Sequence, residues 1–600
     1  MTEFLGEMQR SVYCGEAEER LCGRVITVMG WAAKRRDLGG LIFVDVRDRT
    51  GILQVVFDAS IVGVENFAKA EAIRSEYVVA VTGKLRARGA DSVNDKLKTG
   101  RVELAAETLK LLSDADTPPF ILDEAEKVNE AVRLKYRYLD LRTPYFQQIM
   151  ATKSAVMGIA REFLRKEGFL ELETPFLGKS TPEGARDYLV PSRVHPGAFY
   201  ALPQSPQLYK QILMIAGFDR YFQIARCFRD EDLRANRQPE FTQIDLEMSF
   251  VRDEEDVMRL SEALLKEIFL KAKGVKLPEK IRRIPYREAM DRFGSDKPDT
   301  RFGLELIDVS DLAAGCGFQV FEGAVRSGGS VRMINAKGFY HSLNPILSRR
   351  DVDALGEYVK TYRAKGLAWI ALKDDGVQSV ITKFMKEETV TALLDRAKAE
   401  KGDILFFIAD KNEVVYQTLG ALRLHLAEKA GLVDKSAYDV LWVTDFPLLE
   451  YSPEEKRCVA VHHPFTMPKT EDLAYLDSEP LRVRAMAYDL VINGQEAGGG
   501  SIRIHGRELQ RRMFQALGFT EAQIEERFGF FVGAFNYGTP PHGGLAFGLD
   551  RLIMLLCGTD NIKDVVTFPK VQNASDLMTQ APAPVDKKQL DELRLKPDVR

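Results

Sequence analysis

The sequence contains 600 residues, of which 45% are hydrophobic and 29% are charged, and its formal net charge is −4. This composition excludes disordered and fibrous proteins, and the length predicts about three to five domains, because a single core rarely grows beyond about 300 residues. The nearly balanced charge gives no global sign of a nucleic-acid partner, although it does not exclude local basic patches.

The chain carries no pattern typical of export or of a membrane span. No apolar run approaches the roughly 20 residues that cross a bilayer, and the first residues lack the basic and apolar regions of a signal peptide. The six cysteines are widely scattered, without a Cys-x-x-Cys pair or a histidine at zinc spacing. We therefore expect reduced thiols, a cytoplasmic location and no membrane partner.

The first part of the chain, residues 1–112, predicts a small β-barrel. Short segments rich in Val, Ile and Phe alternate with turns, and a helical stretch, Val64–Glu76, follows the third of them. The predicted strands are Arg24–Trp31, Leu41–Arg47, Leu53–Phe57, Tyr77–Leu85 and Val102–Leu112. Five strands with a helix after the third fit an OB-fold barrel, whose strands commonly bind single-stranded nucleic acid.

The remainder predicts an α+β multidomain chain. Pro118-Pro119 lies in an acidic stretch that reads as a linker, and helical and strand-like patterns alternate after it. The predicted boundaries are 113–135 for the linker, 136–300 and 426–582 for two parts of an antiparallel-sheet domain with flanking helices, 301–425 for an inserted α+β domain, and 583–600 for a tail. The tail reads as a surface helix or a loose end.

Two hairpins are predicted in the sheet domain. Tyr221–Arg229 should pair with Phe241–Phe250, and Met486–Ile492 should pair with Ser501–His505. Asn493-Gly494 favours a tight turn after the first strand of the second pair. These pairings make the antiparallel sheet the centre of the domain.

One strand of the first hairpin presents three polar side chains on the same face. Gln243, Asp245 and Glu247 alternate with apolar residues, so they point in one direction. A solvated face with surface ion pairs is the simpler alternative. The arginine-rich connection over residues 226–237 favours a site for a small polar ligand instead.

A second group of candidate residues surrounds a glycine run. Gly498–Gly500 would let backbone approach a ligand closely, and Asp489 and Glu496 on neighbouring strands could hold Mg²⁺. Two unrelated surface acids are an equally good interpretation from these residues alone. His462 and His463 should face opposite ways, which argues against zinc and favours one histidine in a polar pocket and one in packing.

The segment Gly544–Arg551 and the barrel carry the last two candidate sites. The segment departs from the dinucleotide fingerprint, but its small residues offer a nucleotide a flat strand, and Arg551 at a helix start could meet a phosphate. In the barrel, Arg36 and its basic neighbours precede Phe43 and Gln54, a combination that suits base stacking and phosphate contact. A buried Phe with a solvated charge run explains the same residues equally well.

Together these motifs resemble the signature motifs of class II aminoacyl-tRNA synthetases. The matching segments are Gly168–Pro175, Phe228–Glu231 with Phe241, and Gly544–Arg551. Within that class (subclass IIb), further segments resemble the bacterial aspartyl branch, namely Thr181–Asp187, Gln204–Lys210 and Glu496–Gly500. The similarity covers essentially the whole chain, and the inserted region resembles the GAD domain of that branch.

The resemblance implies an ATP-dependent, AMP-forming ligase that joins L-aspartate to the terminal adenosine of tRNA(Asp). The aspartate site would comprise Glu183, Gln207, Lys210, Arg229, Asp245, His462 and Arg503. The ATP site would comprise Arg229, Asp230, Glu231, Gln238, Phe241, Glu496, Gly548, Leu549, Asp550 and Arg551. Arg229 and Arg551 would be the catalytic pair, and Asp489 and Glu496 would hold Mg²⁺.

The resemblance also implies how partners bind. Anticodon bases would meet Arg36, Phe43, Gln54 and Glu103, and Pro175 would lie in a homodimer interface. Relatives that also charge tRNA(Asn) often have His at the position of Leu38, so we expect an enzyme restricted to tRNA(Asp). Asn236 stands where close relatives often carry Asp, so contacts to the acceptor end of the tRNA should differ slightly.

Three alternatives remain open at this point. A class II synthetase for asparagine or lysine is disfavoured because Lys210 and Arg503 suit an anionic side chain. A non-catalytic RNA-binding protein with the same fold is disfavoured by its complete set of substrate-binding residues. A free-standing amide synthetase would leave the barrel without a purpose.

Overall fold

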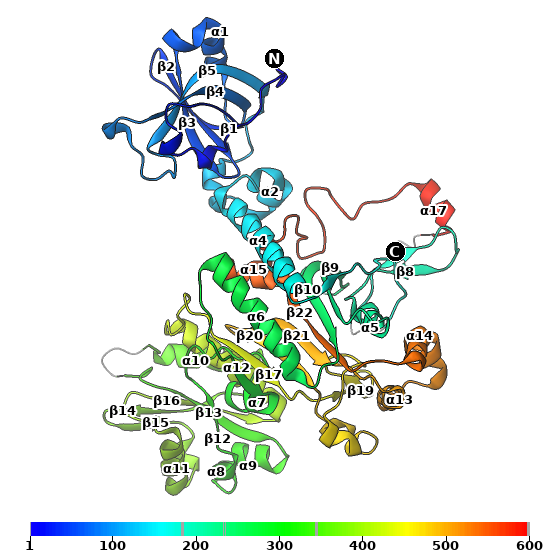
Figure 1. Cartoon of the computed structure of the whole chain (residues 1–600). Coiled ribbons are helices and arrows are strands. Elements are labelled where there is room, and N and C mark those ends of the chain that lie inside the picture. Colours follow the sequence, from blue (N-terminus) through cyan, green and yellow to red (C-terminus); the bar gives the residue numbers. More distant parts are fainter. Residues whose placement is uncertain (1, 182–184, 232, 234–235, 342–345, 597–600) are drawn as a thin grey trace. The chain divides into compact units, whose positions relative to one another are not determined.

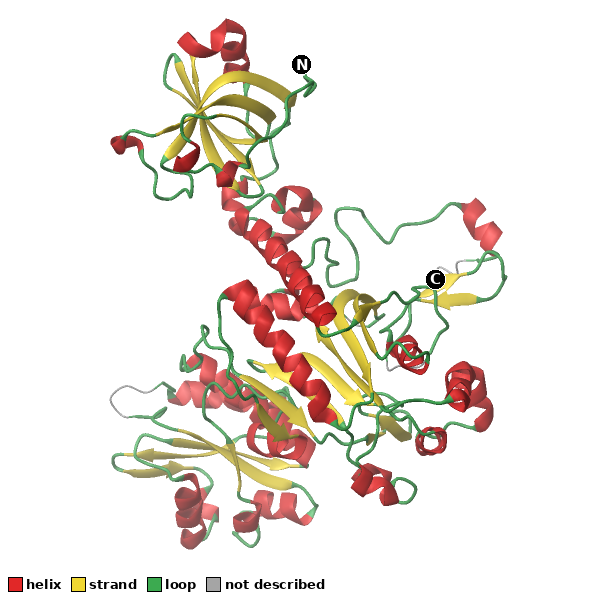
Figure 2. Ribbon diagram, viewed as in Figure 1, coloured by secondary structure: helices red, strands yellow, loops and turns green. Residues whose placement is uncertain are grey.

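The structure is a computed structural model that describes residues 2–181, 185–231, 233, 236–341 and 346–596. The chain packs into two compact units (Figures 1 and 2). One comprises Met1–Thr152 with Lys563–Pro584, and the other comprises Lys153–Ile562 with Val585–Arg600. The division at residue 152 falls inside a helix, and the expected domain boundaries at residues 112, 135 and 582 remain predictions.

The first unit begins with the expected barrel. Its strands are β1 (Val25–Asp37), β2 (Leu41–Asp48), β3 (Gly51–Asp58), β4 (Val78–Ala87) and β5 (Val102–Ser113), closed in the order β1-β2-β3-β5-β4. Alternate residues such as Ile42, Val44 and Val46 point inward and are fully buried. The OB-fold prediction is confirmed. The helix α1 (Ala59–Ala72) starts earlier than expected, because the Asp58 carboxylate accepts a hydrogen bond from the Ser60 backbone and caps it there.

A buried arginine binds the segment Lys563–Pro584 to the rest of the first unit. The short helices α2 (Glu130–Lys135) and α3 (Arg137–Asp140) precede the long helix α4 (Pro144–Lys166). The Arg137 guanidinium donates to the backbone carbonyls of Lys563, Val566 and Thr567. These contacts join residues more than 400 positions apart, which no local sequence pattern predicts.

The second unit is built around an eight-stranded sheet with the order β11-β17-β20-β21-β22-β10-β9-β6. These strands are β6 (Leu170–Glu171), β9 (Arg220–Phe228), β10 (Glu240–Ser249), β11 (Arg282–Pro285), β17 (Val440–Thr444), β20 (Ala487–Ile492), β21 (Gln495–Ile502) and β22 (His542–Gly548). The pairings are antiparallel except β6–β9 and β11–β17. The helices α6 (Glu254–Lys273) and α15 (Leu549–Cys557) pack against each other and the sheet, and Figure 1 shows α6 crossing it.

The glycine run lies inside a central strand, which corrects the expected second hairpin. β20 pairs with residues 495–501 of β21, so only Ser501 of the expected partner Ser501–His505 takes part in that pairing. The run Gly498–Gly500 also pairs with β22 on its other side. A Cβ at Gly500 would lie 2.1 Å from the backbone oxygen of Gly544, so only glycine lets these strands approach so closely.

The inserted region forms a separate five-stranded sheet with the order β12-β13-β16-β14-β15. Its elements are β12 (Leu306–Asp308), α8 (Ser310–Ala313), α9 (Gln319–Arg326), β13 (Ser330–Ala336), α10 (Arg349–Lys360), β14 (Ala368–Lys373), β15 (Gly376–Ser379), α11 (Glu387–Ala397), β16 (Ile404–Asp410) and α12 (Asn412–Lys429). Each face of this sheet has its own apolar core. The prediction of an inserted α+β region is confirmed, and its predicted limits, 301–425, remain a prediction.

The remaining elements connect these parts. They are α5 (Gln207–Ile215), α7 (Tyr286–Phe293), β7 (Leu189–Pro191), β8 (Phe199–Ala201), β18 (Leu449–Ser452), β19 (Arg457–Ala460), α13 (Arg507–Ala516), α14 (Glu521–Ala534), α16 (Ile562–Val565) and α17 (Lys587–Leu593). Across the described residues, no helix combines the length and hydropathy that a membrane crossing requires. All six cysteines are free thiols.

Candidate active site

A cleft with two lobes lies over the central strands of the large sheet. One lobe is lined by Phe241, Gln238 and Arg551 with their neighbours, and we call it the nucleotide lobe. The other is lined by Lys210, His462 and Arg503 with their neighbours, and we call it the cation lobe. Both lobes share Arg229, Gln243, Glu496 and Ala546. A ligand with two parts can therefore lie across Arg229.

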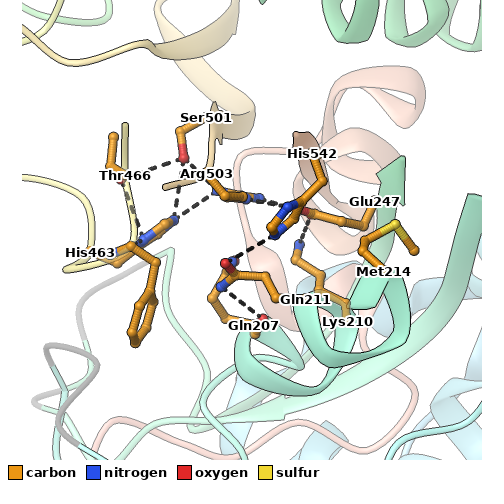
Figure 3. A network of polar contacts seen from close by, with 12 residues as sticks. Gln207, Lys210, Gln211, Met214, Glu247, His463, Thr466, Ser501, Arg503 and His542 are labelled. Carbon is orange, nitrogen blue, oxygen red and sulfur yellow. Dashed lines mark hydrogen bonds and ion pairs between the residues drawn. The ribbon is translucent and has the colours of Figure 1, made fainter. Parts of the chain in front are cut away.

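Two buried cations of the cation lobe, Lys210 and Arg503, pair with the buried carboxylates of Asp245 and Glu247, and Figure 3 shows both cations beside Glu247. The Lys210 ammonium lies 2.6 Å from Asp245 Oδ1 and 3.4 Å from Glu247 Oε2. The Arg503 guanidinium donates to both oxygens of Glu247, at 2.9 and 3.0 Å. The alternating face expected for Gln243, Asp245 and Glu247 is the face on which these ion pairs form.

Burial and charge act in opposite directions on the two carboxyls. Burial raises the pKa of Asp245 above its ordinary value, against the opposing effect of Lys210. Burial alone would raise the pKa of Glu247 as well, but Arg503 and Lys210 hold it below its ordinary value. Glu247 is therefore the anion that pairs with both cations. The Asp245 Oδ2 atom and the Gln207 Nε2 atom have no hydrogen-bond partner among the described residues, which leaves one acceptor and one donor for a ligand.

Helix α5 places Lys210 at the sheet. Gln207, Lys210, Gln211 and Met214 are spaced by three or four residues, so they share the buried face of the helix that packs on β10. Behind them, the His542 ring donates from Nδ1 to the Pro540 carbonyl and lies 3.2 Å from Gln211 Oε1 through Nε2. Burial lowers the pKa of His542 to about 4.

His463 holds Arg503 from the other side. Its Nε2 lies 2.8 Å from Arg503 Nη1, which also donates to Ser501 Oγ at 2.5 Å. Desolvation, together with the Arg503 charge, lowers the pKa of His463 well below its ordinary value. A guanidinium can only donate, so Nε2 accepts from it, while Nδ1 accepts from the Phe465 backbone N–H at 3.2 Å and lies 3.3 Å from Thr466 Oγ1. Sequence reasoning gave His463 no polar role, because the residues that it contacts are distant in the chain.

His462 also lines the cation lobe. Its ring packs edge-on against Phe446, and its Nε2 lies 3.6 Å from Asp489 Oδ1. The expectation of one histidine in a polar pocket and one in packing is therefore incomplete, since both histidines line the lobe.

The nucleotide lobe contains most of the residues expected there. Glu231, Gln238, Phe241, Gly548 and Arg551 line it. The Arg229 guanidinium lies 5.0 Å from the centroid of the Phe241 ring, and Arg551 donates to the Glu496 backbone carbonyl at 2.6 Å. A flat aromatic face and two arginines are what an adenine ring and a phosphate chain require.

Of three further residues expected in the ATP site, Asp550 lines the nucleotide lobe, whereas Asp230 and Leu549 are not among the described residues that line it. Asp550 lines the lobe, but its oxygens accept from Lys153 at 2.5 Å and from the Thr242 backbone at 3.0 Å, so it joins α15 to α4 and β10. Leu549 is fully buried in the core. Asp230 does not line either lobe among the described residues, and its backbone N–H donates to the carbonyl of Arg186. Glu183 lies outside the described residues.

Asp489 and Glu496 converge over Gly499. A Cβ at Gly499 would lie 2.6 Å from Asp489 Oδ1 and 3.7 Å from Glu496 Oε1, so the glycine leaves room between the two carboxylates. The charge of Asp489 and desolvation raise the pKa of Glu496. No group of three or more His, Cys, Asp and Glu side chains able to hold a metal occurs in the part of the chain that the structure describes. The Asp489–Glu496 pair supplies two carboxylates, a number that suits a cation that also binds phosphates.

The four residues expected to contact the anticodon form a connected row on the barrel. Arg36 lies 5.7 Å from the centroid of the Phe43 ring and donates to Gln54 at 2.7 Å. Gln54 in turn donates to Glu103 at 2.9 Å. Leu38 is 71% exposed between β1 and β2. In the second unit, Pro175 is exposed after β6.

Comparisons with known proteins agree with this arrangement. One family model, tRNA synthetases class II (D, K and N), matches residues 129–572, and another, an OB-fold nucleic acid binding domain, matches residues 26–112. The chain is 56% identical over 596 residues to an aspartate–tRNA ligase of Ruminiclostridium cellulolyticum, covering 99% of each chain. It is 55% identical over 599 residues to an aspartate–tRNA(Asp/Asn) ligase of Thermoanaerobacter sp., covering 100% of each.

Solved structures support the fold. An asparaginyl-tRNA synthetase from Pyrococcus horikoshii, complexed with asparaginyl-adenylate, matches with a TM-score of 0.58 at 19% identity, covering 94% of this chain and 98% of that chain. An aspartyl-tRNA synthetase from Entamoeba histolytica matches with a TM-score of 0.54 at 20% identity, covering 92% and 89%. At this level of identity the likeness concerns the fold alone.

Proposed function

Since the chain belongs to the class II tRNA synthetases of the D, K and N group, and within them to the aspartate–tRNA ligase family, we propose that it activates L-aspartate with ATP and esterifies it to tRNA(Asp). The observation that carries this proposal is the cation lobe, where Lys210 and Arg503 converge beside the nucleotide lobe. Two buried cations suit a substrate side chain that is itself an anion.

The cation lobe would select aspartate by charge. Lys210 and Arg503 would bind the side-chain carboxylate, while Gln207 adds a hydrogen bond and His462 closes over the substrate. Glu183, with help from the free Oδ2 atom of Asp245, would accept from the α-ammonium group. A neutral asparagine would lack the negative charge that the two cations attract, and its amide N–H groups would face groups that can only donate.

Arg229 would connect the two substrates during adenylate formation. The aspartate α-carboxylate attacks the α-phosphorus of ATP in line, an O–P bond forms, and the bond to the leaving pyrophosphate breaks. A carboxylate is already ionised at neutral pH, so this step needs no general base. Arg229 and Arg551 would neutralise phosphate charge while Phe241 stacks on adenine, so rate comes from alignment and electrostatics.

Asp489 and Glu496 fit a Mg²⁺ ion that accompanies ATP. The glycine at position 499 leaves the space between their oxygens open, and two carboxylates plus phosphate oxygens are a ligand set that Mg²⁺ accepts. When bound, Mg²⁺ supplies positive charge to the pyrophosphate leaving group. The carboxylates would orient the phosphates through it.

In the second step the terminal 3′-OH of the tRNA attacks the adenylate carbonyl, and AMP leaves. The row Arg36, Phe43, Gln54 and Glu103 would bind anticodon bases by stacking and hydrogen bonding. We further propose that the enzyme is a cytoplasmic homodimer with Pro175 at its interface. Leu38 would restrict charging to tRNA(Asp), although relatives of equal similarity carry both names, aspartate–tRNA ligase and aspartate–tRNA(Asp/Asn) ligase.

One assay tests the whole proposal. The protein is incubated with ATP, Mg²⁺ and labelled aspartate, and tRNA(Asp) and tRNA(Asn) transcripts are offered separately. Charging of tRNA(Asp) alone is the expected result. Charging of both would overturn the role of Leu38 and imply a downstream amidotransferase that converts Asp-tRNA(Asn). If transcripts proven active on a known enzyme remain uncharged, while aspartate-dependent pyrophosphate exchange is also absent, the proposed function is wrong.

A further inference from the structure

The loop over residues 294–305 leads from α7 to the inserted sheet and passes the active site. It starts at Gly294, whose positive φ of 66° ends α7. A Cβ at Gly294 would lie 2.4 Å from the backbone oxygen of Tyr416, and one at Gly420 would lie 2.7 Å from that of Gly294. Both Tyr416 and Gly420 belong to α12. The loop is therefore pressed directly against a helix of the inserted region.

A buried arginine of the same helix fixes the path of the loop. Arg423 is only 1% exposed, and its guanidinium donates to the backbone carbonyls of Asp299, Phe302, Gly303 and Leu304. It also lies 4.3 Å from the ring centroid of Phe302. Burial lowers the pKa of Arg423 to about 10, so the group stays charged at neutral pH. A guanidinium that binds four carbonyls of one loop leaves that loop little freedom.

The loop brings a lysine to the carboxylate pair. The Lys297 ammonium lies 3.2 Å from Asp296 Oδ2 and 3.8 Å from Glu496 Oε2. Asp296 lines the cation lobe together with Asp489 and Glu496. This part of the cation lobe thus contains the carboxylates of Asp296, Asp489 and Glu496. Lys297, on the same loop as Asp296, places a positive charge beside them. Sequence reasoning missed it, because residues 296–297 are about 200 positions from Glu496.

We propose that Lys297 is the counter-ion of the Asp489–Glu496 pair when no nucleotide is bound, and that Arg423 of the inserted region positions it there. This inference rests on the proposed function, because it takes the pair as the Mg²⁺ site. Lys297 and a divalent cation then compete for Glu496, and the ammonium withdraws when the cation arrives. The inserted region would then contribute to catalysis, since its Arg423 positions Lys297, which neutralises the Asp489–Glu496 pair between turnovers.

The simpler alternative is that the Lys297–Glu496 ion pair is a surface contact that does not affect binding of a divalent cation. Exposed ion pairs commonly contribute little to stability, and the Lys297 side chain is partly exposed. The two interpretations differ in the affinity of the enzyme for a divalent cation. A competing ammonium weakens that affinity, whereas an inconsequential pair leaves it unchanged.

The test measures binding of Mn²⁺ to the nucleotide-free protein by electron paramagnetic resonance. Lys297→Met should bind Mn²⁺ about three- to tenfold more tightly than the unmodified protein, the range expected from removing one charge near a divalent ion in a partly solvated site. Lys297→Arg should bind as the unmodified protein does. Lys276→Met, which removes an exposed lysine after α6, is the matched control and should leave binding unchanged. Unchanged or weaker binding by Lys297→Met overturns the proposal.

The positioning role of Arg423 has its own variants. Arg423→Lys keeps the positive charge but can donate to fewer carbonyls. Arg423→Met removes both the charge and the hydrogen bonds to the carbonyls. The thermal unfolding midpoint of each variant shows whether it folds. In a folded variant the Mn²⁺ affinity should rise, and adding Lys297→Met should produce no further rise, because both changes remove the same competitor. Additive effects would contradict the role of Arg423.

Glu496→Gln separates failure of this inference from failure of the proposed function. If Glu496→Gln abolishes Mn²⁺ binding while Lys297→Met has no effect, only the inference is wrong. If Glu496→Gln binds Mn²⁺ normally and retains pyrophosphate exchange, the pair is not the metal site, and both the inference and that part of the proposed function are overturned.

Discussion

Lys210 and Arg503 are buried cations whose positions depend on the carboxylates beside them. Glu247 binds both, and Asp245 binds Lys210 at its other side. Removing one member of such a group leaves an uncompensated charge in a desolvated place, which typically costs about 3–5 kcal/mol. Glu247 and Asp245 therefore hold in place the two cations that we propose bind the substrate.

His542 should make the stability of the second unit sensitive to acid. Its pKa of about 4 in the folded protein lies below the ordinary 6.5, so the stability that it contributes is present above pH 6.5 and is lost as the pH falls towards 4. A shift of this size corresponds to about 3 kcal/mol. His542→Asn should lower the thermal unfolding midpoint at pH 7 but show a smaller further decrease between pH 6.5 and 4.5. Equal decreases in both proteins would contradict this account.

The sequence identified the charged residues of the cation lobe but not the contacts that distant segments make with them. Alternation along β10 predicted the shared face of Asp245 and Glu247, and resemblance identified Lys210 and Arg503. The contact of His463 with Arg503 and that of Lys297 with Glu496 depend on how distant segments pack. Neither spacing nor residue type carries that information.

At the scale of elements, β21 is the centre of the site. It pairs with β20 and β22 along its three glycines, and it places Glu496 beside Asp489. Replacing these glycines has different consequences at neighbouring positions. At Gly499 an added Cβ meets the end of the Asp489 side chain, whereas at Gly500 it meets backbone.

We predict that Gly499→Ala impairs catalysis and that Gly500→Ala impairs folding. The first variant should fold normally and lose about 10²-fold in pyrophosphate exchange, because the Asp489 carboxylate is displaced from its position. The second should lose about 1–3 kcal/mol or more of stability, since backbone must move. Gly158→Ala in α4 meets nothing within 4 Å and serves as the control. The thermal unfolding midpoint and the rate of pyrophosphate exchange are measured for each variant. A normal exchange rate in Gly499→Ala would contradict the predicted loss of catalysis, and an unchanged unfolding midpoint in Gly500→Ala would contradict the predicted loss of stability.

The elements themselves were largely predictable. The five barrel strands, the β9–β10 hairpin and the strand–helix unit of β22 and α15 follow from alternation and turn residues. The extent of β21 could not be predicted in this way, because glycines usually interrupt strands. The three glycines of β21 are explained only by the close packing of β20 and β22 on either side. The membership of residues 563–584 in the first unit was also unpredictable, since it depends on carbonyls bound by Arg137.

At the scale of the molecule, the two units contain the residues of different proposed steps. Both lobes of the cleft belong to the second unit, and the row from Arg36 to Glu103 belongs to the first. Helix α4 runs through the division at residue 152. Adenylate formation should therefore tolerate changes on the barrel that tRNA charging does not.

Phe43→Ala provides that test. Loss of one stacked base should lower kcat/KM for tRNA charging about 10- to 100-fold, while aspartate-dependent pyrophosphate exchange stays unchanged. Phe4→Ala, at a position 92% exposed in the same unit, should leave both activities intact. Arg551→Ala should lose both activities without unfolding. If Phe43→Ala also lost exchange, the assignment of separate tasks to the two units would be wrong.

The row on the barrel is already internally bonded, and this has a consequence for fidelity. Arg36, Gln54 and Glu103 satisfy one another in the absence of RNA. An incoming nucleobase must therefore break these bonds before it forms its own, and only a base edge with matching donors and acceptors restores the full number. If the row binds anticodon bases as proposed, a mismatched base would leave polar groups of the protein unsatisfied, and the hydrogen bonds already present in the free protein would then contribute to rejection of the wrong tRNA.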